Sequence, residues 1–314
     1  MRRTRKVRRN DEGEAQRRRW TFYKAIKKES VVKVSYYPGC ALHGTALEYD
    51  ESTRAVSQML EVEICELPDW NCCGASSAHV TDETLAEKLV SRNLRIAQKQ
   101  GLDVVIPCAA CYSRFKATEK MEKEDLLRHP QPAGQQPIRI LSLLEFMSST
   151  TLRDKIKDSK RRSLSGLKVV CYYGCLLVRP PKVTGAKNYE NPEEMDRLMN
   201  LLGAEAIPWS FKTDCCGGSL VLTRTDIVRH LTQKIFDQAL AAGAEALVVA
   251  CPLCQSNLDS RQEEISREAG KKYELPILYF TELVGLSLGH PHAGKWLKRH
   301  FVDPTKLFAS KGLL

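Results

Sequence analysis

The sequence of 314 residues predicts an α/β fold that occurs twice in one chain. Short runs rich in β-branched and aromatic residues alternate with longer segments of helical periodicity, and this alternation favours parallel strands connected by helices. The order of these segments is the same in both halves. Ten of the twelve cysteines also form two copies of one pattern. We therefore expect two pseudo-symmetric, duplicated α/β domains, each with a mostly parallel sheet flanked by helices.

Each half is expected to contain four strands. Their ranges are 32–37, 62–67, 104–107 and 138–141 in the first half and 168–173, 204–209, 246–250 and 277–280 in the second. Helices are expected between them, around Leu85, Leu89 and Ile96 in the first half and over 193–202 and 227–242 in the second. Ligands of parallel α/β sheets gather beyond the carboxyl ends of the strands, so residues directly after a strand are the first candidates for a site.

The cysteines reveal the duplication through a constant offset. At a separation of 143 residues, Cys72, Cys73, Cys108 and Cys111 correspond to Cys215, Cys216, Cys251 and Cys254. Cys40 corresponds to Cys175 at a separation of 135, so the second copy holds eight more residues after its first cysteine. The segment 178–192, with its Pro, Gly and Asn residues, is the expected place of this insertion.

Four segments make up the expected domain organisation. They are a basic N-terminal extension (1–30), the first domain (31–153), a charged linker (154–166) and the second domain (167–314). Between Met1 and Lys28 the extension carries twelve Lys/Arg and three Asp/Glu, and so nine of the ten net positive charges of the chain. We expect a solvated tail, with peripheral contact to an anionic membrane surface as the alternative. No nucleic-acid recognition element accompanies this charge, so nucleic acid is not an expected partner.

The cysteine content indicates a reducing compartment. The sequence contains no apolar segment typical of an export signal or of a membrane span, so we expect a cytoplasmic location. In such a compartment, patterned cysteines bind metals or carry redox chemistry more often than they form disulfides. Cys65 and Cys171 lie outside the repeated pattern, and Cys65 is expected to be a small core residue.

Each half offers one cysteine after a strand, an adjacent Cys-Cys pair and a Cys-x-x-Cys motif. A structural zinc ion needs four ligands, and an ordinary cubane iron–sulfur cluster also needs four. A thioredoxin-like role would use the Cys-x-x-Cys motif alone and leave the other three cysteines without a function. Five thiols in each half therefore favour an unusual iron–sulfur cluster, with zinc in one half as the competing interpretation.

The doubled pattern resembles the cysteine-rich CCG domain found in the B-type subunits of heterodisulfide reductases. The resemblance extends from about Val32 to the C-terminus, and the flanking segments YYPGCALHGTALEYD and DWNCCGASSAH are closer to bacterial, sulfur-metabolising relatives. It implies two [4Fe–4S] clusters of a non-cubane type and no flavin in this chain. One cluster would be bound by Cys40, Cys72, Cys73, Cys108 and Cys111, and the other by Cys175, Cys215, Cys216, Cys251 and Cys254.

The resemblance also implies an oxidoreductase that acts on sulfur groups. The chain would be the iron–sulfur catalytic subunit of a heterodisulfide reductase-like complex, reducing a disulfide or oxidising thiols or sulfur compounds. The catalytic cluster would be the one bound by Cys175, Cys215, Cys216, Cys251 and Cys254. Its partners would be an A-type subunit that contains flavin and iron–sulfur clusters, a ferredoxin-like C-type subunit and a thiol or disulfide substrate. The alternative is an electron-transfer or anchoring subunit of a succinate dehydrogenase, fumarate reductase, or glycolate or lactate oxidation complex, since CCG domains also occur there.

Overall fold

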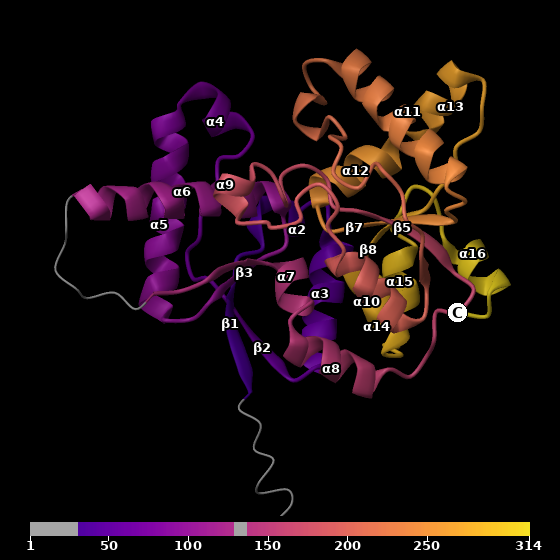
Figure 1. The fold of residues 1–314 in the computed structure, drawn as a ribbon, viewed down its shortest axis with the longest axis horizontal. Coiled ribbons are helices and arrows are strands. Elements are labelled where there is room, and N and C mark those ends of the chain that lie inside the picture. Colours follow the sequence, from indigo (N-terminus) through magenta and orange to yellow (C-terminus); the bar gives the residue numbers. More distant parts are fainter. Residues whose placement is uncertain (1–30, 129–136) are drawn as a thin grey trace, which may run out of the picture. The chain divides into compact units, whose positions relative to one another are not determined.

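The computed structural model describes residues 31–128 and 137–314 (Figure 1). The basic extension expected at 1–30 therefore lies outside the described residues. From Lys33 to Leu314 the chain forms one unit that contains two four-stranded sheets. Both sheets are parallel, and helices connect their strands, so the predicted α/β class and its duplication are confirmed. Among the described helices, none combines the length and the apolar character that crossing a membrane requires.

The first sheet has the strand order β2-β1-β3-β4. Its strands are β1 (Val32–Tyr36), β2 (Val62–Glu66), β3 (Val104–Ile106) and β4 (Ile140–Ser142). Parallel pairing places Tyr36 beside Val105, and Val105 beside Leu141. Because β1 and β3 are neighbours with the same direction, the segments that leave them start from one edge of the sheet.

The second sheet repeats this order as β6-β5-β7-β8. Its strands are β5 (Lys168–Tyr172), β6 (Glu205–Ala206), β7 (Ala246–Val249) and β8 (Ile277–Tyr279). All eight expected strands are present. Strand β6 is much shorter than the expected 204–209, because Pro208 has no N–H group to continue the ladder.

Seven helices belong to the described part of the first half. They are α2 (Gly39–Leu42), α3 (Leu47–Met59), α4 (Ser77–Thr81), α5 (Glu83–Gln100), α6 (Ala109–Arg128), α7 (Leu143–Met147) and α8 (Thr150–Ser159). The carboxylate of Asp82 accepts a hydrogen bond from the N–H of Leu85 and caps α5, and Gly101 ends the same helix in the left-handed conformation. The segment 154–166, expected as a linker, begins inside α8, which buries Leu152 and Ile156.

The second half contains short and long helices in the same alternation. They are α9 (Pro181–Thr184), α10 (Glu194–Leu202), the 3₁₀ turn η1 (Gly218–Leu220), α11 (Thr225–Ala241), α12 (Pro252–Ser260), α13 (Gln262–Ala269), α14 (Phe280–Ser287), α15 (Ala293–Leu297) and α16 (Thr305–Ser310). The expected helices at 193–202 and 227–242 correspond to α10 and α11. Helix α9 lies in the segment expected as the insertion of the second copy.

The two halves of the unit pack directly on one another. Helix α3 of the first half contacts α14 and α15 of the second (Figure 1). There the ring of Tyr49 stacks on that of Tyr279, with 4.1 Å between the ring centroids. Helix α6 contacts α9, and the hydroxyl of Tyr112 donates a hydrogen bond to the carbonyl of Thr184 at 3.3 Å. Because these contacts join the two halves into one unit, the structure does not mark a boundary between them. The expected domain boundaries at 153 and 167 therefore stay a prediction.

Candidate metal centre

The repeated cysteines lie where the sheet topology brings chain segments together. Cys40 and Cys108 follow the neighbouring strands β1 and β3, while Cys175 and Cys251 follow β5 and β7. The Cys-x-x-Cys motifs stand at the first turns of α6 and α12, and Pro252 occupies the first turn of α12. Each adjacent cysteine pair lies in the loop that follows an edge strand of its sheet, β2 or β6.

One thiol of each adjacent pair is buried against its Cys-x-x-Cys motif. The sulfur atoms of Cys73 and Cys111 are 3.1 Å apart, and those of Cys216 and Cys254 are 3.6 Å apart. The remaining thiols lie nearer the surface: Cys40, Cys72 and Cys215 are exposed and Cys175 is half-buried. Each half therefore combines a buried sulfur pair with an accessible side. All twelve cysteines are free.

Mutual hydrogen bonds divide these thiols into proton donors and acceptors. Hydrogen bonds from Cys111 and Cys72 lower the pKa of Cys73 to about 3. In the second half, a hydrogen bond from Cys175 lowers the pKa of Cys215 to about 6. A thiol with such a lowered pKa is a thiolate at neutral pH, which is the form that binds metals.

The two cysteine sets meet in the interior. The pKa of the buried Cys251 thiol is lowered, first by a hydrogen bond from Cys108 of the other half and then by one from Cys254. Tyr49 lies beside this contact, and its hydroxyl donates a hydrogen bond to the carbonyl of Ala250 at 3.3 Å. The Cys-x-x-Cys motifs of the two halves are thus direct neighbours.

Glycines let the backbone approach the sulfur atoms at equivalent places. Gly39 and Gly174, each directly before the first cysteine of its set, have φ angles of +69° and +66°. A Cβ atom would lie 3.1 Å from the sulfur of Cys111 at the first glycine and 3.1 Å from that of Cys254 at the second. Only glycine takes this conformation without strain, and it leaves room beside the sulfur.

Backbone N–H groups reach the exposed sulfur of each adjacent pair. The N–H of Gly74 lies 3.4 Å from the sulfur of Cys72, and that of Gly217 lies 3.3 Å from the sulfur of Cys215. Both glycines have positive φ angles. Hydrogen bonds from N–H groups to ligand sulfur are one of the means by which proteins tune iron–sulfur clusters.

Two tyrosines at equivalent positions hold the loops before the adjacent pairs. The hydroxyl of Tyr37 donates to the carbonyl of Asn71 at 2.9 Å, and that of Tyr172 donates to the carbonyl of Asp214 at 2.5 Å. Neither contact is among the features expected from the sequence. The signal was available, because both tyrosines stand three residues before the first cysteine of their set.

The donor set fits an iron–sulfur cluster in each half. Each half offers five thiols, an N–H group directed at one sulfur and a glycine beside the buried sulfur pair, which is compatible with the thiolate ligands and the hydrogen bonds to sulfur found in iron–sulfur proteins. In residues 31–128 and 137–314, no three His, Cys, Asp or Glu side chains are arranged to hold a single metal ion. The assignment of individual ligands to a cluster stays a prediction. Of the two cysteines outside the pattern, Cys171 is buried in β5 and Cys65 is half-buried, less so than expected for a core residue.

Comparison with known proteins places the chain in a family. The model of the cysteine-rich domain named CCG matches residues 34–116 and 169–259. A membrane anchor subunit of 8-methylmenaquinol:fumarate reductase from Wolinella succinogenes is 31% identical over 87% of this chain and 98% of its own length. The B-type subunit of the ferredoxin:CoB-CoM heterodisulfide reductase from Methanosarcina mazei is 28% identical over 82% of this chain and 89% of its own length.

One solved structure is similar to this chain in its fold alone. A hypothetical protein from Helicobacter pylori superposes with a TM-score of 0.65 and 10% sequence identity. The match covers 86% of this chain and 52% of that one, so the present fold spans about half of the solved chain.

Proposed function

We propose, on the premise that this chain belongs to the CCG cysteine-rich domain family and contains the domain twice, that it is the iron–sulfur catalytic subunit of a heterodisulfide reductase-like complex. Its reaction would be the reduction of a disulfide, or the oxidation of thiols or sulfur compounds in the reverse direction. The observation that carries the proposal is the meeting of the two five-cysteine sets at Cys108 and Cys251.

The arrangement suits a reaction that moves two electrons. Cleavage of a disulfide consumes two electrons and two protons and yields two thiols. A [4Fe–4S] cluster in each half would supply one electron, and the contact between the Cys-x-x-Cys motifs would place the two clusters close together. The non-cubane form of these clusters is part of the proposal, because five thiols exceed the four ligands of a cubane.

The accessible side of each set would admit the substrate sulfur. In the second half, Cys215 is exposed and Cys175 is half-buried, whereas Cys216, Cys251 and Cys254 are buried. The buried thiols would hold the cluster in place, and the exposed side would let a substrate thiolate approach. We assign the reacting cluster to this half, with Cys175, Cys215, Cys216, Cys251 and Cys254 as its ligands. The first set, Cys40, Cys72, Cys73, Cys108 and Cys111, would hold the assisting cluster.

The expected partners are the other subunits of such a complex. The relatives from Methanosarcina mazei and Methanosarcina barkeri are B-type and D-type subunits of heterodisulfide reductases, which supports a role in a multi-subunit assembly. An A-type subunit that contains flavin and clusters and a ferredoxin-like C-type subunit would deliver the electrons. We propose a cytoplasmic location for this complex.

A spectroscopic experiment tests the proposal. The chain is isolated without oxygen, oxidised and mixed with candidate thiols while its paramagnetic spectrum is recorded. We expect a thiol-dependent signal that disappears in Cys216→Ser and persists in the matched first-half variant Cys73→Ser. A signal lost only in Cys73→Ser would assign the reaction to the first half, and stoichiometric zinc without iron would contradict the cluster proposal.

The Wolinella succinogenes relative favours a second candidate. It is a membrane anchor subunit of a fumarate reductase, so the present chain could serve as an electron-transfer or anchoring subunit that touches no disulfide. Binding to vesicles that contain anionic lipid distinguishes the two. Vesicle binding that requires residues 1–28, together with the absence of any thiol-dependent signal, supports the anchoring role. A thiol-dependent signal without vesicle binding supports the sulfur chemistry.

A further inference from the structure

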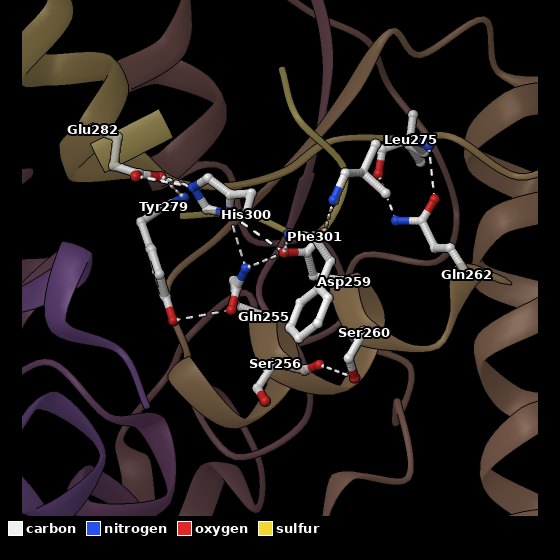
Figure 2. Close-up of polar contacts among 11 residues, drawn as sticks. Gln255, Ser256, Asp259, Ser260, Gln262, Leu275, Tyr279, Glu282, His300 and Phe301 are labelled. Carbon is white, nitrogen blue, oxygen red and sulfur yellow. Dashed lines mark hydrogen bonds and ion pairs between the residues drawn. The ribbon is translucent and has the colours of Figure 1, made fainter. Parts of the chain in front are cut away.

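A buried histidine links three segments of the second half close to its Cys-x-x-Cys motif. The Nε2 atom of His300 lies 3.0 Å from both carboxylate oxygens of Glu282. Its Nδ1 atom lies 2.9 Å from the side-chain amide of Gln255 and 3.6 Å from the carboxylate of Asp259. Figure 2 shows the imidazole between Glu282 on one side and the Gln255–Asp259 pair on the other. The side chains of all three charged residues are almost completely removed from solvent.

This network holds the helix that presents the second Cys-x-x-Cys motif. Gln255 directly follows Cys254, and its amide nitrogen donates a hydrogen bond to the carboxylate of Asp259 at 3.0 Å. Asp259, in the last turn of α12, accepts hydrogen bonds from the N–H groups of Phe301 and Val302 at 2.8 and 3.1 Å. The C-terminal segment that carries His300 is therefore attached to the helix that begins at the cluster ligands.

The first half has an equivalent glutamate, but among its described residues no histidine forms a hydrogen bond or an ion pair with it. Glu145 is the third residue of α7, which follows β4, as Glu282 is the third residue of α14, which follows β8. The position equivalent to Asp259, 143 residues earlier, is Lys116. Burial raises the pKa of Glu145, and Lys116 opposes this rise. His300 lies beyond the part of the chain that the family model matches, so the histidine distinguishes the second half from the duplicated pattern.

The histidine is a cation at neutral pH. Burial opposes its charged form, but Glu282 and Asp259 together raise the pKa of His300 to about 10. The other charged groups near it are Glu48 of α3, whose pKa is raised by burial, and the neighbouring Arg299, which forms an ion pair with Glu51. With the imidazolium present, the two carboxylates of Glu282 and Asp259 carry a local net charge of −1 instead of −2.

We propose that His300 is a positioning residue that compensates the carboxylates behind the second Cys-x-x-Cys motif and thereby makes the second cluster easier to reduce. The inference rests on the proposed function, since it assumes a cluster on Cys251 and Cys254. Two uncompensated negative charges in a buried region would disfavour the arrival of an electron, because electrostatic effects are strong where water is excluded. In the first half, where Lys116 takes the position equivalent to Asp259, a lysine instead of a histidine opposes the charge of the buried glutamate.

Midpoint potentials of charge variants test this inference. The second cluster is identified as the one missing from Cys216→Ser. His300→Gln should lower its potential, whereas Glu282→Gln should raise it. The double variant, which restores the local charge of −1, should return the potential toward that of the unchanged chain. His292→Gln, a change at an exposed histidine eight residues away, serves as the matched control and should leave the potential unchanged.

The outcomes distinguish a failure of the proposed function from a failure of the inference about His300. Iron is counted first, and a chain without iron contradicts the proposed function. Equal midpoint potentials in the iron-loaded chain and in loaded Glu282→Gln contradict the inference alone, and this comparison remains available if His300→Gln fails to fold. A double variant with a lower potential than the single His300→Gln variant would show that packing, rather than charge, is what His300 provides.

Discussion

The hydroxyl of Tyr172 donates a hydrogen bond of 2.5 Å to the carbonyl of Asp214, the residue directly before the second adjacent cysteine pair. The equivalent contact in the first half joins Tyr37 to Asn71. Both tyrosine rings are buried next to their cysteine sets. Each contact fixes a loop that has no regular secondary structure of its own to the end of a central strand.

Removal of the Tyr172 hydroxyl should weaken the attachment of the loop that carries the second adjacent cysteine pair. We expect Tyr172→Phe to cost about 1 kcal/mol of stability, the typical net value of one hydrogen bond, because the ring stays in place. Iron bound to the second half should be released faster to a chelator, while the first half is unaffected. Tyr189→Phe, a change of the same type in the insertion, serves as the control. Equal release rates in the two variants would show that the contact does not support the site.

Alanine in place of Gly174 should reduce the iron content more than alanine in place of another glycine that also has a positive φ angle. The change forces a positive φ angle, which costs about 1–2 kcal/mol, and also places a Cβ atom 3.1 Å from the sulfur of Cys254. Gly185 has a φ angle of +74° with nothing within 4 Å of its Cβ position, so Gly185→Ala carries the strain alone. Iron content should fall only in Gly174→Ala. Similar losses in both variants would mean that the close approach to sulfur is unimportant.

Much of the fold could be predicted from the sequence, because strand runs and helical periodicity are local signals. The cysteine offset also located the duplication and the candidate ligands. Short elements such as α2 and α9 could not be predicted, since a single turn has no measurable periodicity. The network of His300 could not be predicted either. Its members Gln255, Asp259, Glu282 and His300 come from separate segments, and only tertiary packing brings them together.

The stability of the chain should depend on pH through His300. The pKa of this histidine rises from 6.5 in the unfolded chain to about 10 in the folded one, so its contribution is fully present below pH 6.5. It is lost as the pH rises through about 10, by an amount on the order of 5 kcal/mol. Chemical denaturation at several pH values measures this decline, which should be absent in His300→Gln. A parallel decline in both proteins would assign it to other groups.

The two cysteines outside the repeated pattern should be dispensable for metal binding. Cys65 is half-buried beside Glu63, and Cys171 is fully buried within β5. Cys65→Ser and Cys171→Ala should therefore retain the full iron content, although the second variant should lose some stability through its small cavity. Iron analysis after anaerobic purification provides the measurement. Loss of iron in either variant would mean that the ligand set differs from the repeated pattern.

Counting iron and acid-labile sulfide in the anaerobically purified chain and in one variant tests the central claim most directly. Two four-iron clusters predict about eight iron atoms per chain, and Cys216→Ser should lose the half that belongs to the second set. Cys65→Ser should match the unchanged chain. Iron close to zero, one zinc ion per half, or an unchanged iron content in Cys216→Ser would contradict the assignment of a cluster to each five-cysteine set.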